Sequence, residues 1–138
     1  MIIADTGFWL ALANTSDRHH PAAKRTLAGL SEGLVTTWPV VTETCHLLAN
    51  ALSVEAELRF VASLRAGAAM LFSLTADHLE RIHDLMRKYR DLPMDLADAS
   101  LVLLAEHLGS GRILSTDTRD FRTYRWKERK PFKNLLAV

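Results

Sequence analysis

Two acidic residues stand where short apolar segments end, positions from which both could act on one substrate. Asp5 directly follows Ile2–Ala4, and Asp117 directly follows 113–116; both segments are typical of buried strands. The carboxyl ends of parallel strands lie at one edge of a sheet, where α/β folds bind ligands. A turn-forming aspartate that caps the next helix is an equally good interpretation of either residue alone. The matching positions on two strands favour a shared site.

Three further acids fall on predicted helices. Glu43 lies one turn into a helix that begins near Pro39, at the margin of its predicted buried stripe, and the alternative is a partly exposed glutamate paired with a base. That stripe comprises Val40, Thr44, Leu47, Leu48, Ala51 and Leu52. Asp95 and Asp98 lie three residues apart, on one face of another helix. A capping box explains Asp95 well but Asp98 less well, because Glu or Gln is usual at the later position.

Carboxylates gathered in one place need a counter-charge. Two like unit charges roughly 6 Å apart repel by about 3 kcal/mol at an effective dielectric constant of about 20. Such crowding either raises pKa values or is relieved by a divalent cation. The chain has one cysteine, Cys45, and its six histidines show no HExxH or paired spacing. An all-oxygen site therefore indicates Mg²⁺ or Mn²⁺ and not zinc.

The elements that would position these acids alternate along the chain. Strands are predicted at 2–4, 34–37, 70–74, 112–116 and 134–137, and helices at 8–13, 21–30, 39–52, 54–64, 75–89 and 95–108. This order predicts βαβ units and an α/β fold, with a mostly parallel sheet covered on both faces. The chain has 138 residues and shows no linker or internal repeat. We therefore expect residues 1–138 to form one domain.

Several familiar chemistries and locations are excluded or disfavoured. The chain has no GxxxxGK[ST] phosphate loop, no GxGxxG dinucleotide turn and no GxSxG nucleophile elbow. A lone cysteine excludes an internal disulfide. The first residues lack the basic start of a signal peptide, and no apolar run approaches the ~18–20 residues of a membrane helix. We expect a cytoplasmic protein without membrane association.

Charge is distributed unevenly between the two parts of the chain. The formal net charge is +1, but residues 1–111 hold 9 Lys/Arg and 13 Asp/Glu, whereas 112–138 hold 8 Lys/Arg and 3 Asp/Glu. The balance is thus −4 in the first part and +5 in the second. This asymmetry indicates a basic surface that meets a polyanion.

Four segments together resemble the PIN-domain nucleases, and among them the VapC-type toxins of VapBC toxin–antitoxin pairs. The segments are 3–7, 38–43, 94–99 and 113–121. The resemblance implies a three-layer α/β/α sandwich with a central parallel sheet. It also implies an acidic catalytic site formed by Asp5, Glu43, Asp98 and Asp117. In that site Asp5, Asp98 and Asp117 bind one or two Mg²⁺ or Mn²⁺ ions, with Asp95 as an additional ligand or neighbouring acid. The hydroxyls of Thr6 and Ser115 support them.

The resemblance further implies an activity and partners. A metal-activated water would hydrolyse an RNA phosphodiester bond, which needs no side-chain nucleophile. The protein would then be an endoribonuclease toxin and frequently a homodimer, with a cognate antitoxin whose C-terminal segment occupies the active-site groove.

The basic C-terminal part supplies candidate RNA contacts. These are Arg119, Arg122, Arg125, Lys127 and Trp126. Cations hold phosphates and aromatic rings stack on unpaired bases, whereas the alternative is a solvated edge with aromatic anchors in the core. For the whole chain, a non-catalytic RNA- or partner-binding module stays open, as does a metal-dependent phosphatase or DNA nuclease.

Overall fold

A five-stranded parallel sheet forms the centre of the molecule. The computed structural model describes residues 1–136, and its strand order is β3-β2-β1-β4-β7. All four strand pairs are parallel. The strands are β1 (Ile2–Ala4), β2 (Leu34–Thr37), β3 (Met70–Phe72), β4 (Arg112–Leu114) and β7 (Lys133–Asn134). The predicted α/β fold is confirmed.

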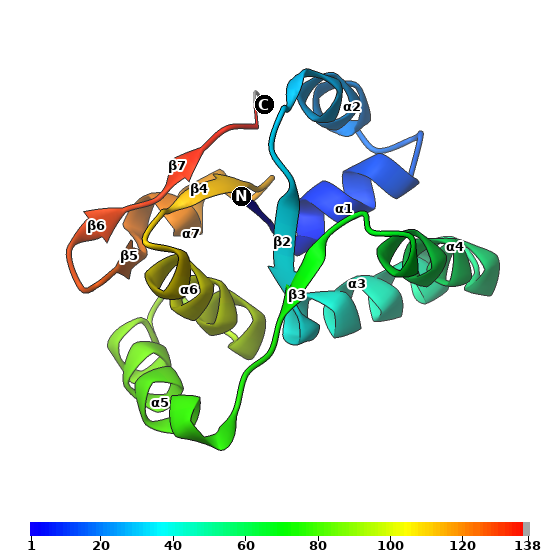
Figure 1. The fold of residues 1–138 in the computed structure, drawn as a ribbon. Helices are drawn as coiled ribbons and strands as arrows, with labels where there is room; N and C mark the ends of the chain where they lie inside the picture. The colour runs from blue at the N-terminus through cyan, green and yellow to red at the C-terminus, as the bar shows by residue number, and fades with distance from the viewer. Residues whose placement is uncertain (137–138) are drawn as a thin grey trace.

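Helices cover both faces of this sheet. They are α1 (Thr6–Ala13), α2 (His20–Gly29), α3 (Trp38–Ala51), α4 (Val54–Arg65), α5 (Leu79–Lys88), α6 (Leu96–Leu108) and α7 (Thr118–Thr123), with a 3₁₀ turn η1 (Ala76–His78) before α5. Figure 1 shows α1 to α4 on one side of the sheet and α5 to α7 on the other. The three-layer sandwich that the resemblance implied is therefore present.

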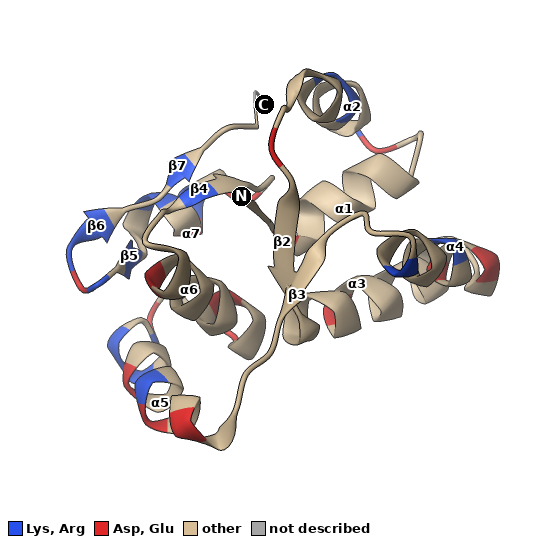
Figure 2. Cartoon of the chain, viewed as in Figure 1, with Lys and Arg blue, Asp and Glu red and all other residues tan. Residues whose placement is uncertain are grey.

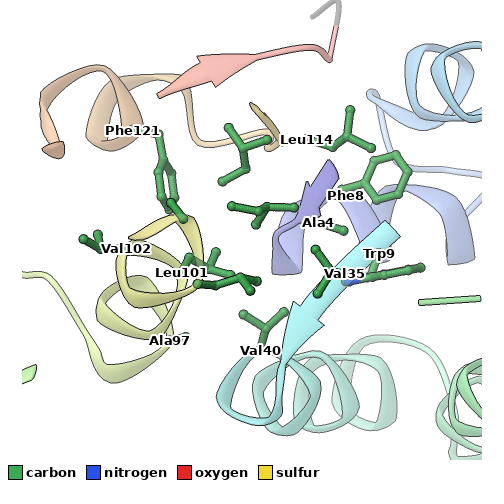
Figure 3. Close-up of a cluster of buried hydrophobic side chains, with 14 of the residues drawn as sticks. Ala4, Phe8, Trp9, Val35, Val40, Ala97, Leu101, Val102, Leu114 and Phe121 are labelled. Atoms are coloured by element: carbon green, nitrogen blue, oxygen red, sulfur yellow. The ribbon is translucent and has the colours of Figure 1, made fainter. Parts of the chain in front are cut away.

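The core lies between the sheet and the two helical layers. Ile3, Ala4, Ile113 and Leu114, from the two central strands, are fully buried. Figure 3 shows side chains from α1, α3, α6 and α7 converging on these strands. Strands without polar alternation are thus buried on both faces, as a doubly covered parallel sheet requires.

The buried face of α3 is narrower than predicted. Val40, Thr44 and Leu48 are buried, but Leu47 and Leu52 are 38% and 42% exposed. Ala51 is also exposed. Within residues 1–136, the elements packed on α3 (α1, α4 and α6) cover only part of the predicted stripe.

The C-terminal part differs most from the sequence prediction. The helix α7 and a two-stranded antiparallel hairpin, β5 (Arg125–Trp126) with β6 (Lys130–Pro131), were not predicted. The last strand of the sheet begins one residue earlier than expected, at Lys133, and the predicted end at Ala137 lies outside the described residues. Strands β3 and β4 are each two residues shorter than predicted.

Local sequence explains where the helix that carries Asp95 and Asp98 begins and ends. Asp95 is the N-cap of α6 and forms a capping box with Asp98. Gly109 ends the helix in the left-handed conformation, with φ of 68°. Among the helices of residues 1–136, none is both long and apolar enough to cross a membrane.

Candidate active site

The two aspartates that follow strands lie at the same edge of the sheet. Ala4 of β1 pairs with Leu114 of β4, and the Asp5 N–H donates to the Leu114 carbonyl at 3.1 Å. This register places Asp5 and the loop that carries Asp117 side by side at the carboxyl ends of the two central strands. Asp5 is the N-cap of α1 and Asp117 the N-cap of α7. Each of these two aspartates therefore caps a helix and also belongs to a common site.

The hydroxyl of Ser115 connects these two acids. It donates to Asp5 Oδ2 at 2.9 Å and accepts the Asp117 N–H at 3.0 Å. The other carboxylate oxygen of Asp5 accepts the Thr6 N–H at 2.7 Å. Asp5 is only 7% exposed, so its orientation is fixed by packing and by two hydrogen bonds.

Two helix N-termini bring the other acids to this edge. In the capping box of α6, Asp95 Oδ1 accepts the Asp98 N–H at 2.8 Å, and Asp98 Oδ2 accepts the Asp95 N–H at 3.2 Å. Glu43, on the first turns of α3, is half-buried and lies close enough to Asp95 for that carboxylate to raise its pKa. The Thr6 hydroxyl lowers the same pKa, although Thr6 Oγ1 makes no hydrogen bond of ordinary geometry within residues 1–136.

Burial and mutual repulsion shift the ionisation of these carboxyls. Burial raises the pKa of Asp5 to about 6, against the two hydrogen bonds that lower it, and the charges of Glu43 and Asp117 add to the rise. Burial and the neighbouring Asp95 charge raise the pKa of Asp98 to about 8. The pKa values of Glu43 and Asp117 are raised as well, in both cases chiefly by burial. Burial and mutual repulsion therefore disfavour the ionised forms of these carboxyl groups.

Within residues 1–136 no ion pair compensates this charge, although the charge of Arg119 partly offsets the burial that raises the pKa of Asp117. Among the described residues, none of the five acids forms an ion pair with Lys or Arg. Hydrogen bonds within residues 1–136 also leave Asp95 Oδ2, Asp98 Oδ1 and Asp117 Oδ2 unengaged. As these side chains stand, no three Asp, Glu, His or Cys residues of this part of the chain are spaced to share one metal ion. In charge and donor type the acids fit a hard divalent cation, and rotation of side chains would be needed to bring their oxygens to it.

A glycine permits the close approach of the two strand ends. A Cβ atom on Gly7, in the first turn of α1, would collide with the hydroxyl of Thr116, which directly precedes Asp117. A larger residue at this position would force the Thr116 side chain to move.

One residue that the sequence analysis missed contacts the acids. The hydroxyl of Tyr124, a buried residue after α7, lies 3.4 Å from both Asp98 Oδ2 and the Leu92 carbonyl and can donate its proton to either. Burial and the charge of Asp98 raise the pKa of this hydroxyl, so it stays protonated and acts as a donor. Its spacing of three residues from Phe121 in an apolar pattern was the available signal for burial.

A groove beside the acids was also missed. Trp38, Pro39 and Leu96 line it together with Glu43 and Asp95, and its volume is about 560 Å³. The available signal was the position of Trp38, which directly follows β2 at the carboxyl edge of the sheet.

The basic C-terminal segment, residues 119–133, lies beside α6 and β4, where Figure 2 shows Lys and Arg gathered on β4 to β7. Arg119 and Arg122 on α7, and Lys127 in the hairpin, are exposed. Arg125 is half-buried, and its Nη1 donates to the carbonyls of Arg122, Thr123 and Tyr124 at the end of α7. That guanidinium therefore also has a structural role, since it caps a helix.

Trp126 is 7% exposed. Its indole N–H donates to the Pro131 carbonyl at 3.0 Å, and the ammonium groups of Lys127 and Lys130 lie 5.9 and 5.0 Å from its ring centroid. This burial does not support the stacking role predicted for Trp126, because the ring packs inside the hairpin.

The sequence of this chain matches a known protein family. The model of the PIN domain matches residues 2–127, a range that contains all five acids. The chain belongs to the PIN-domain family. A ribonuclease of Mycobacterium tuberculosis, VapC26, is 32% identical to this PIN domain over 124 residues, which cover 90% of this chain and 92% of the relative.

A second relative supplies a solved structure. The 23S rRNA-specific endonuclease VapC20 of M. tuberculosis is 29% identical over 100 residues, or 72% of this chain and 76% of the relative. The crystal structure of M. tuberculosis VapC20, a sarcin–ricin loop cleaving toxin, matches this PIN domain with a TM-score of 0.79 at 25% identity. The matched region covers 86% of this chain and 92% of the VapC20 chain. The predicted resemblance to VapC-type toxins and the PIN-like fold are confirmed.

Proposed function

We propose that this PIN domain is a divalent-metal-dependent endoribonuclease and the toxin of a toxin–antitoxin pair. The observation that carries the proposal is the group of acids at the carboxyl edge of the sheet, none of which forms an ion pair with a Lys or Arg within residues 1–136. Relatives named VapC26 ribonuclease and VapC20 endonuclease support the same activity.

Asp5, Asp98 and Asp117, with Asp95, would hold one or two Mg²⁺ or Mn²⁺ ions. When bound, such an ion lowers the pKa of a water molecule and stabilises negative charge on a phosphate oxygen. Burial, with repulsion among the acids added to it, raises the pKa values of Asp5 and Asp98, and a bound cation would stabilise their ionised forms, so binding and ionisation are expected to be coupled.

The other residues of the site would position and complete it. The Ser115 hydroxyl holds Asp5 and the Asp117 loop in register. Glu43 makes no hydrogen bond of ordinary geometry within residues 1–136 and has a raised pKa, so its carboxylate is free to accept a proton at the site. Thr6 lies beside it and limits that rise.

The substrate we propose is RNA. Arg119, Arg122, Arg125 and Lys127 would contact its phosphates, with Arg125 also retaining its cap on α7. VapC20, the 29% identical relative, is specific for 23S rRNA, which makes a sarcin–ricin stem-loop the first oligonucleotide to test.

The partners we propose are a cognate antitoxin and a second copy of the chain, in the cytoplasm. Support comes from the VapC relatives and from a second, apolar groove of about 520 Å³ that an antitoxin could cover. It is lined by Trp9, Leu12, Leu27, Ala56 and Phe60 among others. Co-purification of the protein with the product of an adjacent short gene, and its mass in solution, test these two partners.

A cleavage assay tests the enzyme. Purified protein is incubated with the stem-loop RNA in Mn²⁺ or Mg²⁺, in chelator, and in chelator followed by excess metal. We expect cleavage that stops with chelator and returns with metal. RNA binding without metal-dependent cleavage would favour the non-catalytic binding module. Preferential cleavage of DNA or small phosphoesters would favour a DNA nuclease or a phosphatase.

A further inference from the structure

One large aromatic side chain at the acidic edge has no role in the site described so far. Trp38 is the first residue of α3 and is 53% exposed, whereas Trp9 and Trp126, the other two tryptophans of the chain, are buried. The exposed part of the indole adjoins other apolar groups, Pro39 and Leu96, in one groove, and a contiguous apolar patch is typical of a contact with another molecule.

The indole shares a groove with the acids. Trp38, Pro39 and Leu96 form apolar walls, and Glu43 and Asp95 lie in the same groove. Leu96, the first residue of α6, is 46% exposed. The N-termini of α3 and α6 thus place an apolar surface directly beside the carboxylates.

Hydrogen bonds fix this surface in place. The Ser100 hydroxyl, on α6, donates its single proton to the Ala97 carbonyl at 2.6 Å. Ser100 Oγ must therefore accept from Thr37 Oγ1, also at 2.6 Å. Because Thr37 directly precedes Trp38, this buried bond ties the start of α3 to α6. The backbone that carries Trp38 is thus held in position, which reduces the entropy lost when the residue binds a ligand.

The chemistry of the groove selects its ligand. Its lining is mainly apolar and includes no Lys or Arg, with His46 and Thr42 as its uncharged or weakly basic polar members, while its acids repel a phosphate that is not accompanied by a cation. A planar, uncharged ring is what an exposed indole contacts best. The Lys and Arg residues of segment 119–133 lie on other elements than this groove.

We propose that Trp38 stacks on an unpaired base adjacent to the phosphodiester that the acids hydrolyse. Trp38 is then a positioning residue: it orients the strand and makes this PIN domain select an unpaired nucleotide at the cleavage site. The inference rests on the proposed function. A second copy of this chain, or a partner peptide, is the competing occupant of the groove.

Cleavage by Trp38→Ala and Trp38→Phe tests the stacking, with Leu79→Ala, an exposed apolar residue on α5, as the matched control. We expect kcat/KM to fall roughly 5- to 100-fold in Trp38→Ala, the range of stacking on one base. Trp38→Phe should keep most of the activity, because it retains an aromatic face, and Leu79→Ala should match the wild type.

An RNA substrate with one abasic nucleotide identifies the contact. The abasic position is moved along the strand on either side of the cleaved bond. One adjacent position should slow the wild type by the same factor as Trp38→Ala, and should not slow Trp38→Ala further. Since the other tryptophans are buried, uncut RNA bound to Asp98→Asn should also shield the indole fluorescence from acrylamide.

The outcomes separate the two proposals. If the wild type cleaves and Trp38→Ala cleaves equally well, the stacking inference is wrong and the nuclease stands. A loss in Trp38→Ala that is the same for every abasic substrate, and that accompanies a change from dimer to monomer, assigns the groove to a second copy. If the wild type cleaves no RNA, both proposals fail.

Discussion

The acidic edge and the basic C-terminal segment carry opposite charges and differ in how far those charges are exposed to solvent. Asp5 is buried and its pKa is raised, whereas the Arg119 side chain is 81% exposed and pairs loosely with Asp120. Charges inside the protein interact strongly and are poorly screened, while exposed charges are weakened by salt. We therefore expect the acids to determine the rate of RNA cleavage and the basic residues to determine the affinity for RNA.

The largest effect should come from neutralising one of the acids at the site. Asp98→Asn keeps the shape of the side chain and an oxygen for the capping box, but removes the charge. We expect RNA cleavage to fall by more than about 100-fold, measured as kcat/KM with Mn²⁺. Asp5→Asn should behave alike, and Asp84→Asn, on the exposed face of α5, should not. Full activity in both site variants would overturn the site assignment.

The same variant should change stability in a pH-dependent way. The pKa of Asp98 is about 8 in the folded protein and about 3.9 in an unfolded chain. The folded state therefore holds its proton more tightly, and stability is lost as pH rises from about 4 through 8. At pH 8 in chelator, the free energy of unfolding of Asp98→Asn should exceed that of the wild type by roughly 1–3 kcal/mol after allowance for partial exposure, and its unfolding temperature should be higher. At pH 4 the two proteins should unfold at the same temperature.

Added Mn²⁺ provides the control for that measurement. It should raise the unfolding temperature of the wild type at pH 8, because a ligand that binds only the folded state stabilises it. The shift should be much smaller in Asp98→Asn. Equal shifts in the two proteins would place the cation elsewhere.

Removing the hydroxyl between the two strand-end acids should have a smaller effect. Ser115→Ala deletes a hydrogen bond that lowers the pKa of Asp5 and leaves the Asp117 N–H without its acceptor. We expect a loss of activity of about 10-fold, a destabilisation of about 1 kcal/mol, and an acidic limb of the pH–rate profile moved to higher pH. The exposed Ser73→Ala serves for comparison, and an unmoved limb would show that Ser115 does not act through Asp5.

The smallest effect should come from the basic segment. Arg119→Ala and Arg122→Ala should each weaken RNA binding a few-fold, and each lost phosphate contact should reduce the slope of log affinity against log salt by about 0.7. Fluorescence anisotropy over a salt series measures this slope. Lys24→Ala, on α2 across the molecule (Figure 2), is the matched control. A slope that does not change would mean that these arginines do not touch the substrate.

The sequence predicted the elements whose signal is local. The strand β1 is a continuous apolar run, and in β4 two apolar residues follow Arg112, because both faces of these strands are covered. Asp5 and Asp117 therefore had determined positions at the carboxyl edge. The capping box of α6 was also evident in the spacing of Asp95 and Asp98.

What the sequence did not predict depends on contacts between distant elements. The helix α7 has only six residues, too few for a periodic pattern, and the hairpin after it is defined by packing that buries Trp126 among cations. Leu47 and Leu52 fit the apolar period of α3, but no pattern indicates which neighbours cover a helix. The exposure of Trp38 was unpredictable for the same reason.

The tight fit at Gly7 makes the spacing of the two strand-end acids sensitive to one methyl group. In Gly7→Ala the new carbon would force the Thr116 hydroxyl to rotate away and the Thr116 Cβ to shift slightly. Every ionisable group of the site would survive such a change, but the residue that precedes Asp117 would be displaced. A loss of activity in Gly7→Ala would therefore show that the position of this loop matters to the reaction as well as its charges.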